Sequence, residues 1–379
     1  MNAAVRPESP TRRDRLARVG VRVVAVLLST IVGLGLAELL VGAVRGWAFP
    51  YLNIFVADPD YGVRLEPNAA TAVRSREGRV TDIRTNARGF RGDDWSPALT
   101  GAPVPGRVLL LGDSQVFAYG VEEEDGVAAR LEAALGAGAE VLDAATPTWG
   151  PPEYARVAAE LAPVYRPEVV VFVANVANDW LEAHIPNVRR TTARDGWASY
   201  RRPDVPVEPD SAVHRWLFGR SHLVYAVRAL LSGVSGDPPA GAVSARRLLS
   251  NLTNMTKRDG AYRTRLTRHV AAVRDACASL GCRVVVAVLP LDLQVDAGEW
   301  AKYRDTPEDL GALDVLARDL LADAADLGVP GVDLRPVLVR ASPGAFLPDD
   351  YHLAPRGHAA VAAALATLVA APAAGAPAP

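Results

Sequence analysis

Five short apolar runs that alternate with helical segments constrain the fold of this chain more than any other feature. The third run, EVVVFVAN, consists mostly of β-branched residues, as expected of a strand that is buried on both faces. The runs are 107–112, 139–144, 168–175, 282–290 and 328–334, and the helical segments are 125–135, 152–162, 261–280, 310–328 and 354–371. This alternation predicts an α/β fold with a doubly wound, mostly parallel five-stranded sheet in a three-layer α/β/α arrangement.

An apolar stretch near the N-terminus predicts a membrane helix. Residues 23–44 carry one charge, Glu38, and at about 1.5 Å per residue they form about 33 Å of helix, enough to cross a bilayer core of about 30 Å. Arginines cluster in residues 1–22, whereas Arg45 alone follows the span directly. The positive-inside rule therefore predicts a basic cytoplasmic tail, a single-pass signal anchor in the cell inner membrane, and an extracytoplasmic remainder.

Two other interpretations of this stretch remain open. A cleavable signal peptide would use Val41-Gly42-Ala43 as its small-residue site, but its apolar region would be unusually long. The third interpretation is a buried helix of a soluble domain. Within the span, Glu38 either reaches the headgroup region or pairs with another helix, and we expect it to be tolerated there rather than functional.

Composition excludes several functional classes. The chain has 41 Lys and Arg against 43 Asp and Glu, a net charge of −2, which argues against nucleic-acid binding. The two cysteines, Cys277 and Cys282, either form a disulfide in an oxidising compartment or pack as two small buried side chains. The histidines lack metal-ligand spacing, and no phosphate-binding loop occurs, so we expect neither a metal nor a cofactor.

The chain divides around the α/β segment. Residues 45–106 predict an irregular lead-in with a few short strands, 107–371 the main domain with an insertion at 180–258, and 372–379 a disordered tail. The aromatic residues of the insertion could form a lid or sugar-binding wall, but the core of a small helical subdomain is the favoured interpretation. A third alternative is a helix at 212–231 that lies on the membrane. The aromatic residues in question are Trp180, Trp197, Trp216, Phe218 and Tyr225.

Three polar motifs follow strands of the predicted sheet. Ser114 follows the first strand, Asn178 follows the third, and Asp349 and His352 follow the last. Taken singly, each motif has a structural explanation that involves no catalysis: a helix cap, a turn and a surface histidine, respectively. Taken together, they converge at the carboxyl edge of the sheet, where ligands of such sheets bind.

The sequence around these motifs resembles the SGNH hydrolases, also called the GDSL esterase/lipase family. The blocks that carry the resemblance are GDSQVFAYGV (112–121), NVAND (175–179) and DDYHLAPRGH (349–358), and the likeness covers about residues 107–371. The predicted anchor, followed by a TNxxGFRG-like stretch at 85–92, resembles a membrane-anchored bacterial branch. The resemblance implies a flavodoxin-like sheet.

The resemblance also implies a catalytic triad. Ser114 would be the nucleophile, His352 the general base, and Asp349 the carboxylate that orients the histidine. Asp113 would support the serine turn through hydrogen bonds.

The oxyanion hole implied by the resemblance departs from the family pattern. Its donors would be the Ser114 N–H, the Asn178 side chain and an N–H from DAATPTWG at 143–150. Thr148 occupies a position where the family has glycine, and a positive φ is costly for a β-branched residue. We therefore expect either an ordinary conformation at Thr148 or donation by Gly150. Val176 likewise replaces a glycine.

The leading hypothesis is a membrane-anchored serine esterase that hydrolyses an acyl ester, such as an acetyl group on an envelope glycan, through an acyl-Ser114 intermediate. An alternative is an O-acyltransferase that passes the acyl group to a glycan or other hydroxyl acceptor. A third is a non-catalytic binding module on the same fold, which the substitutions at Thr148 and Val176 motivate. The sequence does not identify any protein partner.

Overall fold

The computed structural model describes residues 12–75, 77–201, 211–232, 245–258, 260–303, 307–348 and 350–371. Residues 1–11 of the predicted basic tail, the tail 372–379 that we expected to be disordered, and Asp349 lie outside the described residues.

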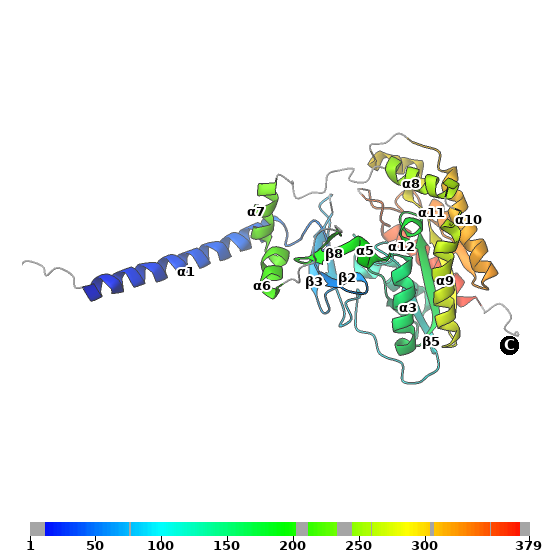
Figure 1. Cartoon of the computed structure of the whole chain (residues 1–379), viewed down its shortest axis with the longest axis horizontal. Helices are drawn as coiled ribbons and strands as arrows, with labels where there is room; N and C mark the ends of the chain where they lie inside the picture. The colour runs from blue at the N-terminus through cyan, green and yellow to red at the C-terminus, as the bar shows by residue number, and fades with distance from the viewer. Residues whose placement is uncertain are drawn as a thin grey trace, which may run out of the picture.

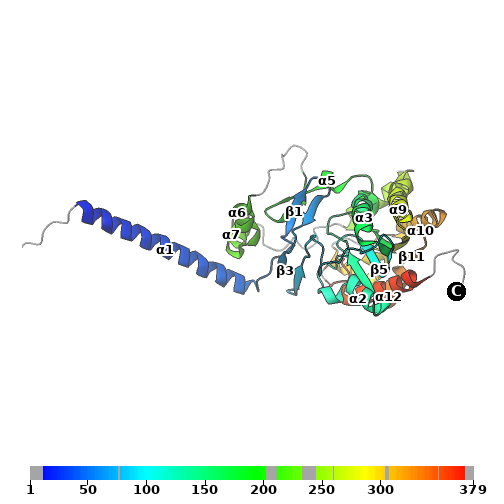
Figure 2. The ribbon, with the colours of Figure 1, turned by 90° about the horizontal axis from the view of Figure 1, so that it is seen from below.

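A long N-terminal helix stands apart from the rest of the molecule. Helix α1 (Arg12–Val44) projects away from the other elements in both ribbon views (Figures 1 and 2). It contains a span, Arg15–Val44, that is long and apolar enough to cross a membrane, and none of the span's most apolar window is buried against protein. By length and composition it qualifies as a membrane anchor or a signal sequence.

The central sheet has the predicted composition and topology. Its five strands run in the order β11-β10-β7-β5-β6, and every neighbouring pair is parallel. In chain order this is the 2-1-3-4-5 arrangement of a flavodoxin-like fold, whose topological switch point lies between β5 and β7. The strands are β5 (Val104–Leu111), β6 (Glu140–Asp143), β7 (Pro167–Asn175), β10 (Arg283–Leu289) and β11 (Gly331–Asp333).

Helices cover both faces of the sheet. One face packs against α2 (Val127–Leu135), α11 (Arg335–Ala341) and α12 (Pro355–Ala370). The other packs against α3 (Pro151–Tyr165), α9 (Tyr262–Ala278) and α10 (Gly311–Asp326). Successive residues of β7 alternate between the two cores, with Val171 on the first and Phe172 on the second. The three-layer fold with one N-terminal apolar helix is therefore confirmed.

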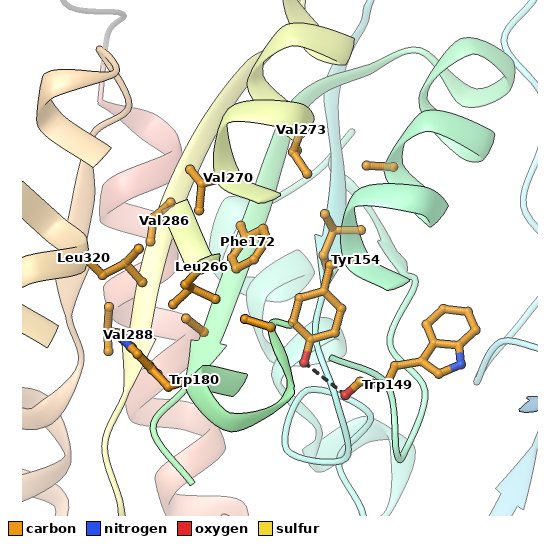
Figure 3. Packing of buried hydrophobic residues seen from close by; sticks show 14 of the residues in the cluster. Trp149, Tyr154, Phe172, Trp180, Leu266, Val270, Val273, Val286, Val288 and Leu320 are labelled. Carbon is orange, nitrogen blue, oxygen red and sulfur yellow. Dashed lines mark hydrogen bonds between the residues drawn. The ribbon is translucent and has the colours of Figure 1, made fainter. Parts of the chain in front are cut away.

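The second core contains large side chains near the carboxyl edge of the sheet. Figure 3 shows Phe172 of β7 between residues of α3 and α9, among them Tyr154 and Val270. Tyr154 makes an edge-to-face contact with Phe172, with ring centroids 5.3 Å apart. Such close packing holds the ends of the strands, and the loops that follow them, in fixed positions.

The lead-in forms two antiparallel hairpins that lie between α1 and the main sheet (Figure 2). The first pairs β1 (Phe55–Asp58) with β2 (Gly62–Leu65), and the second pairs β3 (Ala70–Arg74) with β4 (Val80–Arg84). The insertion adds a third hairpin, β8 (Thr191–Arg194) and β9 (Trp197–Tyr200). Phe55 N–H donates to the Gly196 carbonyl at 2.9 Å and so joins the insertion to the lead-in.

The remaining elements are short or belong to the insertion. They are η1 (Glu123–Asp125), α4 (Asp179–Glu182), α5 (Asn187–Arg190), α6 (Ala212–Arg215), the π-helical turn η2 (Trp216–Arg220), α7 (His222–Ser232), α8 (Ala245–Arg258), η3 (Asp292–Gln294) and η4 (Ala297–Lys302).

Of the two states left open for the cysteines, the structure has the disulfide. Cys277 near the end of α9 and Cys282 before β10 are bonded, with their Cα atoms 4.9 Å apart. The described part of the chain therefore contains no free thiol. A disulfide is compatible with an oxidising compartment.

Candidate active site

Ser114 lies in the turn that follows β5, at the carboxyl edge of the sheet. The preceding Gly112 is sterically required, because a Cβ there would lie 2.3 Å from the side chain of Val116. Asp113 holds the turn from both sides: one carboxylate oxygen accepts the Gln115 N–H at 2.9 Å, and the other accepts the Asn175 amide at 2.8 Å. The last bond ties the end of β5 to the end of β7, at the switch point of the sheet.

His352 lies within hydrogen-bond distance of the serine. Its Nε2 is 2.8 Å from Ser114 Oγ, and its Nδ1 is 2.8 Å from a carboxylate oxygen of Asp350. Serine, histidine and carboxylate are thus linked in the order that nucleophilic catalysis needs: nucleophile, base and orienting group.

The carboxylate on the histidine is not the one that we expected. Asp349 was predicted to orient His352, but it lies outside the described residues, and Asp350 occupies that place. The chain turns between Asp350 and His352, so that the same carboxylate also accepts the His352 N–H at 3.3 Å. Lys302 Nζ donates to the Asp350 carbonyl at 2.9 Å and fixes this turn.

Gln115 joins the histidine loop to the serine turn, and the sequence analysis missed it. Its amide nitrogen donates to the Tyr351 carbonyl at 3.1 Å, while its amide oxygen accepts the Leu353 N–H at 3.0 Å. The two bonds flank His352 and connect residues 236 and 238 positions apart in the chain. The only sequence signal for this role is the position of Gln115, directly after the serine.

The electrostatics of the pair suit a base that works near neutral pH. Burial alone would lower the pKa of His352, but the charge and hydrogen bond of Asp350 outweigh it and raise the pKa above its usual range. Burial would conversely raise the pKa of Asp350, and His352 holds it below its usual range. Asp350 therefore stays ionised while His352 accepts a proton.

Thr148 has a strained backbone, contrary to our expectation of an ordinary conformation. Its φ is +80°, a region in which a β-branched residue costs on the order of 1–3 kcal/mol. Two contacts hold it there: Arg190 donates to its carbonyl at 3.1 Å, and Asn187 donates to its hydroxyl at 3.2 Å. The alternative donor is committed elsewhere, because the Gly150 N–H donates to Glu153 at 3.1 Å.

The hydrogen-bond donors near the serine differ in whether they already have an acceptor. Within the described part of the chain, the N–H groups of Ser114 and Thr148 make no hydrogen bond. Asn178 donates its amide to Glu182 at 3.2 Å, and its buried amide oxygen has no partner among the described residues. Val176, at the family's other glycine position, is buried and donates its N–H to the Leu289 carbonyl at 2.9 Å.

Buried carboxyl groups lie behind this donor region, and the sequence patterns did not predict them. Burial raises the pKa of Glu182 to about 8, although Arg190 forms an ion pair with it. Burial also raises the pKa of Asp179 well above its usual range, and this carboxyl group accepts the Asn175 N–H at 2.8 Å and the Tyr154 hydroxyl at 3.1 Å.

A cavity of about 560 Å³ opens over Ser114 and His352. Thr148, Asn175 and Asn178 line it beside the serine. The lead-in and the insertion also line it, with Tyr51, Leu52, Phe55, Trp197, Tyr200 and Leu248. The aromatic residues of the insertion therefore differ in role: Trp197 faces the cavity, Trp180 is buried in the core, and Trp216 is exposed.

A family model described as SGNH hydrolase-like domain, acetyltransferase AlgX, matches residues 250–378. Residues 250–378 therefore belong to an SGNH hydrolase-like domain. The matched segment includes Asp350 and His352, whereas Ser114 and Asn178 precede it. A comparison of the sequence with curated proteins gives no match. An SGNH hydrolase-like domain supports an enzyme of the esterase or acyl-transfer type.

Several solved structures are similar to the chain. A protein of the G-D-S-L family from Desulfitobacterium hafniense is 13% identical, with 70% of this chain and 99% of that one covered and a TM-score of 0.38. A carbohydrate acetylesterase from Sinorhizobium meliloti is 12% identical, with 70% and 98% covered and a TM-score of 0.36. The aryl esterase of M. smegmatis is 15% identical, with 69% and 97% covered and a TM-score of 0.35.

None of the other described histidines lines the cavity over Ser114. Among the described residues, no group of three or more His, Cys, Asp or Glu side chains is arranged to hold a metal ion. His358, in the first turn of α12, is fully buried, and neither ring nitrogen has a partner in the described part of the chain. Burial lowers its pKa to about 3, so the ring is neutral.

Proposed function

We propose that the protein is a membrane-anchored, extracytoplasmic serine esterase that cleaves an acyl ester through an acyl-Ser114 intermediate. The observation that carries the proposal is the position of the His352 ring, which has Ser114 Oγ on one nitrogen and the Asp350 carboxylate on the other, each at 2.8 Å. A nucleophile that is hydrogen-bonded to a base and lines a cavity is the minimum that acyl transfer requires.

The proposed reaction has two halves. Ser114 Oγ attacks the ester carbonyl carbon while His352 Nε2 takes its proton, and Asp350 stabilises the imidazolium that results. The tetrahedral intermediate collapses, the C–O bond to the alcohol breaks, and His352 returns the proton to the leaving oxygen. Water then attacks the acyl-serine with His352 again as the base, releasing the carboxylic acid and restoring the Ser114 hydroxyl.

The oxyanion of each intermediate would be held beside Thr148. The N–H groups of Ser114 and Thr148 are the proposed backbone donors, because neither is committed to another bond in the described part of the chain. The strain at Thr148 supports this role, since strained residues persist at sites where the surrounding contacts enforce them. The Asn178 amide is the proposed third donor; it lines the cavity and would turn from Glu182 to the oxyanion.

We expect Asn178→Ala to lower kcat by about 10²–10³-fold with little change in KM, because an oxyanion donor acts mainly in the transition state. Steady-state hydrolysis of p-nitrophenyl acetate measures both constants. Asn254→Ala, on the exposed side of α8, is the matched control and should leave both unchanged. A rise in KM at constant kcat for Asn178→Ala would assign the amide to ground-state binding instead.

Transfer to a hydroxyl acceptor is the second candidate function. The description of the matching family model, an acetyltransferase, favours it, and the cavity of about 560 Å³ is larger than an acetyl group requires. A glycan hydroxyl held in this cavity could take the place of water in the second half-reaction. The acceptor, rather than the serine, would then distinguish the two functions.

The partition of the acyl group tests the proposed function. With the full chain in detergent and p-nitrophenyl acetate as donor, we expect free acetate to equal the p-nitrophenol released, whether or not neutral oligosaccharides are added. An oligosaccharide-dependent loss of free acetate, matched by acetylated sugar, would replace hydrolysis by transfer. The absence of both p-nitrophenol and an acyl adduct would favour the non-catalytic module.

A further inference from the structure

In the segment Ser211–Ser232, which comprises α6, η2 and α7, charged side chains face the protein and apolar side chains face outward. We call this segment the platform. Its charged residues face the protein: Arg220 and Arg215 reach Glu66 at 2.7 and 3.7 Å, and His214 is bonded to Asp195. Its large apolar residues face outward, with exposed fractions of 75% for Val213, 65% for Trp216, 82% for Leu230 and 81% for Leu231. A surface helix in water shows the reverse arrangement.

The platform is bonded directly to α1. Both carboxylate oxygens of Glu38 accept hydrogen bonds from the start of α7: the Ser221 hydroxyl at 2.6 Å, the His222 N–H at 2.7 Å and the Leu223 N–H at 2.9 Å. These N–H groups belong to the first turn of a helix, where they have no partner within the helix and where a negative charge is stabilised. Figure 1 shows α6 and α7 beside the end of α1.

The position of Glu38 fixes the depth of this contact. The residue lies six positions before Val44, the last residue of α1, which is about 9 Å along the helix axis. Helices that lie in a membrane interface bury their apolar side about 5–10 Å into the boundary between headgroups and acyl chains. A lone carboxylate at that depth would be costly, and the start of α7 supplies its partners. Of the two alternatives for Glu38, the structure therefore has the pairing with another helix, and the residue does more than occupy a tolerated position.

An aromatic layer connects the platform to the catalytic cavity. The His222 ring stacks on Phe49 with centroids 4.3 Å apart, and Tyr225 packs against Trp197 at 5.6 Å. Trp197 also contacts Phe49 at 5.7 Å and lines the cavity over Ser114. Gly219 secures the join, because its carbonyl accepts the Asn53 amide and a Cβ at this position would collide with the Asp195 carbonyl.

We propose that the platform inserts its apolar side into the bilayer that α1 crosses, at the boundary between headgroups and acyl chains on the extracytoplasmic side. The lipid surface is the occupant that fits, because the exposed apolar side chains of the platform are joined at Glu38 to a helix whose most apolar window is likewise unburied. This inference rests on the part of the proposed function that makes α1 an anchor. The catalytic domain is then held on the membrane in one orientation instead of swinging on a tether.

Spin labels at single introduced cysteines test the platform in the full chain, reconstituted in vesicles of phosphatidylethanolamine and phosphatidylglycerol. Because the native cysteines are bonded to each other, only the new thiol takes the label. Leu230→Cys and Val213→Cys report on the platform, Val32→Cys on α1, and Val339→Cys, on exposed α11, on the aqueous phase. Collisions with oxygen, which concentrates in lipid, and with a water-soluble nickel complex are measured for each label. Retained circular dichroism shows that each variant folds.

We expect the oxygen-to-nickel ratio at Leu230 and Val213 to exceed the ratio at Val339 several-fold and to approach the ratio at Val32. Ratios equal to that at Val339, while Val32 remains in lipid, would overturn the platform and leave the anchor intact. Shielding of both platform labels from both reagents would assign the surface to a protein partner and would also overturn the proposal. An aqueous ratio at Val32 would reject the anchor, and the platform with it.

Discussion

Ser114→Ala will abolish turnover of p-nitrophenyl acetate, lowering kcat by on the order of 10⁴-fold or more. The physical reason is that Ser114 Oγ forms the acyl bond in the proposed mechanism, and among the described residues it is the hydroxyl that lies within 2.8 Å of His352 Nε2. Any residual rate reflects binding and the oxyanion donors alone. Intact-mass measurement after a brief exposure to the ester should find an added acetyl group on the wild type and none on the variant.

A matched serine variant separates loss of the nucleophile from loss of the fold. Ser279→Ala, beyond the end of α9 and remote from the cavity, should retain full turnover and the acetyl adduct. Ser114→Ala should keep the unfolding transition of the wild type, because its side chain is small and half-buried. Persistence of the adduct in Ser114→Ala would place the nucleophile elsewhere and reject the mechanism.

The sheet could be predicted because its signal is local and redundant. A strand that is buried on both faces must be apolar along its whole length, as in the run that becomes β7, and the intervening helices have their own period. The helices α8 and α11 and the hairpin β8–β9 were not predicted. The strands of the hairpin have four residues each and α11 has seven, too few for a clear periodic pattern, and α8 carries many polar residues. Tertiary contacts, such as the bond from Phe55 to Gly196 in the hairpin, hold such elements in place.

The sequence predicted which types of residue follow each strand of the site, but not which individual carboxylate contacts the histidine or which backbone conformation Thr148 adopts. Two adjacent aspartates precede His352, and spacing alone favoured Asp349, whereas the path of the turn brings Asp350 to the ring. Thr148 shows the same limit. Its residue type argued for an ordinary backbone, and only the contacts from Arg190 and Asn187, far along the chain, explain its positive φ. Glu38 had no visible partner in the sequence because the start of α7 follows about 180 residues later.

Asp350→Asn will lower kcat by about 10³–10⁴-fold, as loss of the orienting carboxylate does in other serine–histidine pairs. An amide can still hydrogen-bond to Nδ1, but it favours the wrong tautomer and cannot stabilise the imidazolium. Asp349→Asn, the neighbouring and isosteric change, should retain most of the wild-type rate. The ratio of the two kcat values, measured with the same ester, decides which carboxylate serves the histidine; a larger loss for Asp349→Asn would restore the assignment made from spacing.

The pH dependence of kcat/KM is a second, independent test of the Asp350–His352 pair. A folding defect would lower the rate without moving the pH at which the rate falls. The base must be neutral to accept a proton, so kcat/KM falls as the pH drops through the pKa of His352. Asp350 raises this pKa, and the acid limb of the wild type should therefore lie above about 6.5, the ordinary value for histidine. Removing the charge leaves burial, which favours the neutral ring, and the charges of Asp113 and Asp292, which raise the pKa by less than Asp350 does. The limb of Asp350→Asn should thus move to lower pH while the plateau falls, and an unmoved limb would show that the Asp350 carboxylate does not set the charge of the base.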